Sequence, residues 1–163
     1  MSLFRTRELP VELPILPRAA VCFTTPAMTR RAAEWLKKLG GCQPVAILSD
    51  DCDDVAWQCE AEQADLLLLE TDFSEASEDT RDVSARCDIA IEVKRRLPAC
   101  RVYLLCEEGH PEKLPALDKA VELKLIDGYY VGDLPARQGR SWIAETVRSL
   151  SRQAGGHGIT DKR

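Results

Sequence analysis

The sequence predicts an α/β fold, a three-layer sandwich in which helices cover both faces of a parallel sheet. Two observations carry this prediction. Short apolar segments alternate with amphipathic helical segments five times over the 163 residues, and such strict alternation implies parallel strands with right-handed crossovers. One segment, Ala64–Thr71, holds four consecutive leucines between two acids, which is typical of a central strand buried on both faces.

The first half of the chain supplies three strands and two helices. Arg18–Thr24 is apolar and rich in β-formers. The helix expected over Ala27–Leu39 carries apolar residues three and four apart and ends at two glycines. Pro44–Leu48 is the second strand. Acidic residues then supply an N-cap and favourable charge for a helix over Asp53–Gln63, which leads into the leucine strand.

The second half repeats the pattern. A polar, acidic loop over 71–80 precedes a helix over Arg81–Leu97, which ends because Pro98 cannot continue it. The remaining elements are two strands over Arg101–Cys106 and Ile126–Val131, and two helices over about Pro115–Leu123 and about Ala136–Leu150 or slightly beyond.

We divide the chain into three parts. Residues 1–17 form an N-terminal arm, where three prolines exclude a helix. Residues 18–151 form one domain, which suits the chain length. Residues 152–163 are expected to be a flexible tail or linker, since they are rich in glycine.

Composition excludes several classes of protein. The net charge of -5 disfavours direct nucleic-acid binding. No apolar stretch approaches the roughly 20 residues that cross a bilayer, and the first residues lack the apolar core of a signal peptide. We therefore expect a cytoplasmic protein with no membrane partner. No glycine-rich phosphate loop follows the first strand, which excludes dinucleotide and P-loop sites.

Seven cysteines are scattered through the chain, and no two are spaced as C-x-x-C. We expect reduced thiols, many of them buried as small apolar groups. A structural zinc site or a redox pair is the alternative.

Four segments together resemble one family. Asp65–Glu70, Pro98–Leu105, Ile126–Gly132 and Trp142–Leu150 are similar, in order and spacing, to parts of the receiver (CheY-like) domains of two-component response regulators. The resemblance implies a flavodoxin-like fold with sheet order 2-1-3-4-5. In that family a carboxylate ending the third strand accepts a phosphoryl group, and two acids after the first strand hold magnesium. A hydroxyl after the fourth strand and a lysine after the fifth bind the phosphoryl oxygens.

This sequence departs from the family at each of these positions. Glu70 occupies the phosphoacceptor position, where its extra methylene moves the carboxylate about 1.5 Å further out. Thr24 and Thr25 replace the acidic pair, Cys106 replaces the hydroxyl residue and Gly132 replaces the lysine. The resemblance therefore implies a degenerate receiver, or pseudo-receiver, with no catalytic residue, no metal and no cofactor.

Two of the aligned residues admit two interpretations each. Glu70 is either a solvated carboxylate at a strand end or a permanent mimic of the phosphorylated state. Tyr129 matches the family's switch aromatic, although a half-buried packing role would give the same residue. The side chains of Trp35, Trp57 and Trp142 are expected to pack helices against the sheet.

The acidic run after the second strand also has two interpretations. Its members, Asp50, Asp51, Asp53 and Asp54, are expected to form a solvated helix N-terminus. The alternative is a weak divalent-ion site shared with Asp72 or Glu75.

The function expected from the resemblance is phosphorylation-independent signalling through protein interaction, not catalysis. The family's output surface corresponds to helix 115–123, strand 126–131 and helix 136–150, and a homodimer through this face is one expected partner. The alternative is a flavodoxin-like protein that binds FMN or another phosphorylated ligand at Thr24–Thr29, a threonine-rich loop at a helix N-terminus. Pro26 removes one N–H donor from that loop, and Phe73 is the one ring after the third strand that could stack on a flavin.

Overall fold

The structure is a computed structural model that describes residues 16–71 and 81–160; for residues 81, 82 and 151–160 it describes the backbone alone. It contains a five-stranded parallel sheet in the order β2-β1-β3-β4-β5, which confirms the expected fold class. The strands are β1 (Arg18–Cys22), β2 (Gln43–Ala46), β3 (Leu66–Glu70), β4 (Arg101–Cys106) and β5 (Gly128–Val131). The helices are α2 (Pro26–Leu39), α3 (Cys52–Glu62), α4 (Arg81–Arg96), α5 (Leu114–Glu122) and α6 (Arg137–Thr160), with a short 3-10 helix η2 (Pro111–Lys113) before α5.

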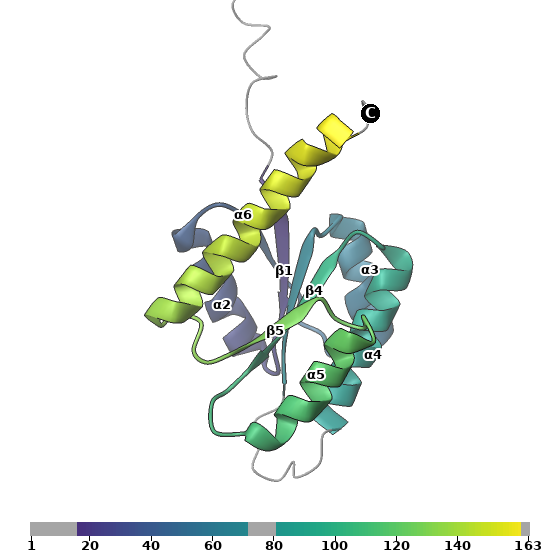
Figure 1. The fold of residues 1–163 in the computed structure, drawn as a ribbon, viewed down its shortest axis with the longest axis vertical. Coiled ribbons are helices and arrows are strands. Elements are labelled where there is room, and N and C mark those ends of the chain that lie inside the picture. Colours follow the sequence, from purple (N-terminus) through teal and green to yellow (C-terminus); the bar gives the residue numbers. More distant parts are fainter. Residues whose placement is uncertain (1–15, 72–80, 161–163) are drawn as a thin grey trace, which may run out of the picture.

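Helices cover both faces of the sheet. Figure 1 shows α2 and α6 on one side and α3, α4 and α5 on the other. In the central strand β3, Leu66 and Leu68 belong to the apolar core under α2 and α6. Leu67 and Leu69 belong to the core under the other three helices, and all four leucines are fully buried. The leucine run is thus a strand buried on both faces, as expected.

The last helix differs from the sequence-based expectation. The predicted end lies at about Leu150 or slightly beyond, whereas α6 continues to Thr160, so the backbone of residues 152–160 is helical in the stretch assigned to a tail or linker. Ile143 and Val147 fix the start of this helix against the core, and each residue added to a nucleated helix gains one backbone hydrogen bond. The arm up to residue 15, the loop over 72–80 and residues 161–163 lie outside the described residues.

The three tryptophans divide into two packed and one exposed. Trp142 contacts two rings of the sheet, Tyr103 edge-on at 5.5 Å and Tyr130 in a stack at 5.2 Å, and Trp35 packs against the same core. For Trp57 the packing prediction is wrong, because 60% of the residue is exposed. The residues of α3 that reach the core are small, namely Val55, Ala56 and Cys59.

No helix within residues 16–71 and 81–160 has the length and apolar character of a membrane-spanning segment.

Gly139 lies where α6 passes close to the backbone of the preceding loop. A Cβ at this position would lie 2.3 Å from the carbonyl oxygen of Asp133 and 2.4 Å from that of Leu134. Backbone atoms cannot rotate away as a side chain can, so we expect Gly139→Ala to lower the free energy of unfolding by about 1–3 kcal/mol, typical of overpacking. Urea denaturation measures this change. Gln138→Ala, exposed in the same turn, is the control and should change stability little; an equal loss in both variants would contradict the close approach.

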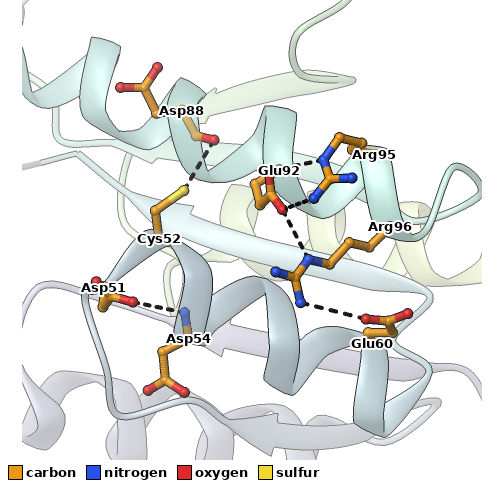
Figure 2. Close-up of polar contacts among 8 residues, drawn as sticks. All are labelled: Asp51, Cys52, Asp54, Glu60, Asp88, Glu92, Arg95 and Arg96. Carbon is orange, nitrogen blue, oxygen red and sulfur yellow. Dashed lines mark hydrogen bonds and ion pairs between the residues drawn. The ribbon is translucent and has the colours of Figure 1, made fainter.

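A charged network joins α3 to α4 (Figure 2). The guanidinium of Arg96 lies 3.0 Å from the carboxylate of Glu92 and 3.6 Å from that of Glu60, while Arg95 donates two hydrogen bonds to Glu92. These hydrogen bonds from Arg95 and Arg96 lower the pKa of Glu92 from 4.5 to about 2.

The lowered pKa of Glu92 makes the stability of the protein depend on pH in a defined window. A depressed carboxyl pKa contributes stability that is complete above its unfolded value and is lost as the pH falls toward 2. We therefore expect Glu92→Gln to show a weaker loss of stability than the parent between about pH 5 and pH 2. Denaturation midpoints measured at several pH values test this, and parallel curves for the two proteins would contradict it.

Candidate functional site

The carboxyl ends of the parallel strands bring the aligned residues to one edge of the sheet. Glu70 ends β3 and pairs with Leu105 of β4, and Cys106 at the end of β4 pairs with Val131 of β5. Thr24 follows β1, the other neighbour of β3. In α/β sheets of this kind, ligands bind outside the carboxyl ends of the strands.

Glu70 is buried and bonded, not solvated. It is only 4% exposed, so the expectation of a solvated carboxylate is wrong. Its oxygen Oε1 accepts two hydrogen bonds from Thr24, one from the backbone N–H at 2.7 Å and one from the hydroxyl at 2.6 Å. Hydrogen bonds to an ionised group are among the stronger ones in proteins. At the position where the resemblance places an acid, Thr24 therefore supplies two hydrogen-bond donors. The Glu70 side chain is long enough to reach both.

Thr25 has a structural role of its own. Its hydroxyl oxygen accepts a hydrogen bond from the N–H of Met28 at 3.1 Å and caps the N-terminus of α2. Sequence reasoning missed the neighbouring Thr29, which is 1% exposed. The Thr29 hydroxyl accepts from the N–H of Phe23 and donates to the carbonyl of Thr25. Both hydroxyls hold the turn between β1 and α2.

Cys106 and Gly132 lie side by side after β4 and β5. The N–H of Gly132 donates to the carbonyl of Cys106 at 2.8 Å. Burial raises the pKa of the Cys106 thiol, which makes the thiolate scarce. Gly132 has a φ of +136°, a conformation that side-chain-bearing residues rarely adopt. Position 132 therefore has no lysine, and its backbone conformation would also disfavour one.

Tyr129 points toward α5. Its hydroxyl donates a hydrogen bond to Asp118 Oδ1 at 2.5 Å, and this bond is the main reason that its pKa is raised. The ring is half-buried. Tyr130, the next residue, stacks on Trp142 of α6. The two tyrosines thus tie the edge strand β5 to the helices on either side.

A cavity of about 700 Å³ opens beside Glu70. Its wall combines apolar side chains of the β1–α2 region and of the segment after β5 with several charged groups. The lining residues are Phe23, Met28, Arg31, Ala32, Trp35, Glu70, Leu105, Cys106, Glu107, Glu108, Gly132, Asp133, Leu134 and Pro135. A phosphate placed here would meet four carboxylates and one guanidinium. The charge of the cavity therefore disfavours the FMN alternative, and Phe73 lies outside the described residues.

The acidic run after β2 caps a helix. Asp51 accepts a hydrogen bond from the N–H of Asp54 at 2.9 Å and is the N-cap of α3 (Figure 2). Among the described residues, no group of three or more His, Cys, Asp or Glu side chains could hold a metal ion. Asp72 and Glu75, the other expected members of a divalent-ion site, lie outside those residues.

The thiols are mostly buried, as expected. All seven are free; six are buried and Cys52 is half-buried. Burial raises the pKa of Cys22 to about 11 and that of Cys100 to about 12. Thiols held in the neutral form are poor nucleophiles and poor metal ligands, so these cysteines resemble core residues more than a redox centre.

Two buried cations lie on the face of the sheet that α3, α4 and α5 cover, and sequence reasoning missed both. Arg86 of α4 is 8% exposed, and Lys113 of η2 is 2% exposed. The positive charge of Arg86 and the negative charge of Glu70 both act on the Cys22 thiol, in opposite directions. Arg86 is therefore a buried cation on α4, whereas the resemblance places a lysine after β5. Nothing in the helical pattern of α4 distinguishes Arg86 from the surface arginines around it.

No protein-family model matches the sequence, and no curated protein matches it. Several solved structures are similar to this one in fold. A response regulator receiver domain protein from Clostridium thermocellum is 14% identical with a TM-score of 0.61, over 86% of this chain and 98% of that chain. The REC domain of AraT, a response regulator from Geobacillus stearothermophilus, is 14% identical with a TM-score of 0.57, over 88% and 99% of the two chains. NtrX from Brucella abortus is 14% identical with a TM-score of 0.62, over 91% of this chain and 30% of that chain. The chain therefore has the five-stranded CheY-like fold of receiver domains.

Proposed function

We propose that this protein is a cytoplasmic, phosphorylation-independent signalling and interaction module on a receiver fold, and not an enzyme. The observation that carries the proposal is the state of Glu70. Its carboxylate is buried, and Oε1 is occupied by both donors of Thr24. Phosphoryl transfer also needs metal ligands and positive charge placed around the acceptor oxygen, and Thr24, Thr25 and Gly132 bring neither a carboxylate nor a lysine to this edge. Glu70 in this arrangement is a fixed charge at the phosphoacceptor position.

Acetyl phosphate with magnesium tests the loss of phosphorylation. We expect the intact mass of the protein to stay unchanged under conditions that phosphorylate a receiver domain with a complete site. Glu70→Asp should also remain unmodified, because the acid, the hydroxyl and the lysine of a complete site are still missing. Thr24, Cys106 and Gly132 occupy their positions. A stoichiometric phosphoryl adduct that disappears in Glu70→Gln would contradict the proposal.

The proposed interaction surface is formed by α5, β5 and α6. Tyr129 is bonded to Asp118 of α5, and Tyr130 is stacked on Trp142 of α6. These contacts tie β5 to the helices on either side, and they involve no phosphoryl group. Leu123, which directly follows α5, exposes 56% of its surface and would give a contact on this face an apolar side chain. We propose a homodimer through this face.

Sedimentation of single-residue variants tests the dimer. Leu123→Glu is expected to weaken self-association, because it places a charge in the apolar part of the interface. Ile91→Glu is the matched control, since Ile91 of α4 is 45% exposed outside this face. A protein that is monomeric at all concentrations, or a dimer that Ile91→Glu disrupts and Leu123→Glu does not, would contradict the assignment.

A further inference from the structure

We propose that the cavity beside Glu70 binds a small organic cation, a primary amine joined to an apolar body. This inference goes beyond the proposed interaction function, because it concerns a small ligand at the carboxyl edge of the sheet and not a protein at the α5–β5–α6 face. It rests on the charge of the cavity, on the buried carboxylate in its wall, and on the apolar surface around that carboxylate.

Negative charge dominates the cavity. Glu70, Glu107, Glu108 and Asp133 contribute four carboxylates to the lining, and Arg31 contributes the one guanidinium. Clefts with low-dielectric walls focus the field of the charges that line them and concentrate ligands of opposite sign. The cavity therefore selects cations over anions.

Glu70 supplies a specific anchor within this field. The residue is 4% exposed, and both donors of Thr24 bind the same oxygen, Oε1. No described residue donates a hydrogen bond to the other oxygen, Oε2. Buried carboxylate oxygens normally have a partner, and an ammonium group carries several N–H donors. A charge pair with a carboxylate that is 4% exposed is screened less by water than a pair on the surface.

The rest of the lining fits an apolar body. Phe23, Trp35, Leu105 and Leu134 belong to the wall, and an aromatic ring attracts a cation that lies over its face. The volume of about 700 Å³ lies within the range of small-molecule sites. A bare metal ion would leave this apolar surface unused, whereas an aromatic or aliphatic amine would cover it.

Three probes of one shape and different charge test the proposal. Benzylamine, benzyl alcohol and benzoate are titrated separately into the full chain, followed by two-dimensional 1H–15N NMR. We expect saturable shifts with benzylamine at the amides of Thr24 and Gly132, and a dissociation constant about tenfold below that of benzyl alcohol. Benzoate should not bind. Equal binding of all three probes, or no saturation by benzylamine at these amides, would overturn the proposal.

Charge-removing variants locate the anchor. Glu70→Gln keeps the size of the side chain and an oxygen that can accept from Thr24, so we expect about tenfold weaker benzylamine binding with unchanged benzyl alcohol binding. The paired change Glu107→Gln with Glu108→Gln alters only exposed residues and should weaken benzylamine in the same direction. Glu122→Gln on α5, outside the cavity, is the control. Unchanged benzylamine affinity in both cavity variants would refute the site, whatever the phosphorylation test shows.

Discussion

Replacing Leu68 with alanine is expected to lower the free energy of unfolding by about 2–5 kcal/mol, the usual cost of removing a buried leucine side chain. Leu68 is fully buried in the middle of β3, where it pairs with Val21 of β1 and Tyr103 of β4. The helices α2 and α6 cover this side of the strand. Because strands and helices surround Leu68, the structure would relax little after the substitution. A cavity would therefore remain in place of the leucine side chain.

The same experiment tests whether both faces of the sheet are covered. Leu67 points to the opposite core and is equally buried, so Leu67→Ala should cost a similar amount in guanidinium denaturation. Leu48→Ala, at a leucine that is 44% exposed and lies outside the proposed dimer face, is the matched control and should change stability by less than about 0.5 kcal/mol. A large loss at only one of the two adjacent leucines would mean that one face of β3 lacks its helical layer.

The sequence predicted the fold because its signals are local and agree with one another. Alternating strand and helix patterns leave few topologies open, and the leucine run identified the central strand. Trp57 and α6 were mispredicted because their states depend on tertiary context. Whether an apolar residue on a helix meets a neighbour depends on how the helix is rotated on the sheet, and glycines in the last helix lower its propensity without excluding it.

The site was predicted less completely than the fold. The spacing of motifs placed Glu70, Cys106 and Gly132 at the correct edge of the sheet, since strand ends follow from strand positions. It did not show that Glu70 is buried and bonded to Thr24, because these residues are 46 positions apart and their contact depends on the path of the β1–α2 turn. The signal that could have revealed the pair is the joint replacement at the two positions. Thr24 brings a hydroxyl where an acid is expected, and Glu70 brings a longer acid where an aspartate is expected.

The contact between Thr24 and Glu70 is expected to account for a measurable part of the stability of the protein. Thr24→Val keeps the shape of the side chain and the backbone donor but removes the hydroxyl that lies 2.6 Å from Oε1. We expect it to cost about 1–3 kcal/mol, because a buried charged acceptor loses a partner. Glu70→Gln should cost less, since its amide oxygen still accepts from Thr24.

A double-mutant cycle distinguishes this contact from two independent losses. The combined Thr24→Val and Glu70→Gln variant should be more stable than the sum of the single changes predicts, with a coupling energy between about 0.5 and 3 kcal/mol. Thr25→Val is the control, because it removes the α2 cap and should add to Glu70→Gln without coupling. Additive losses for Thr24 and Glu70 would mean that the hydroxyl does not hold the carboxylate. Strong coupling would mean that the fold itself holds the acid at the end of β3 in one position, through the bonds from Thr24 to Oε1.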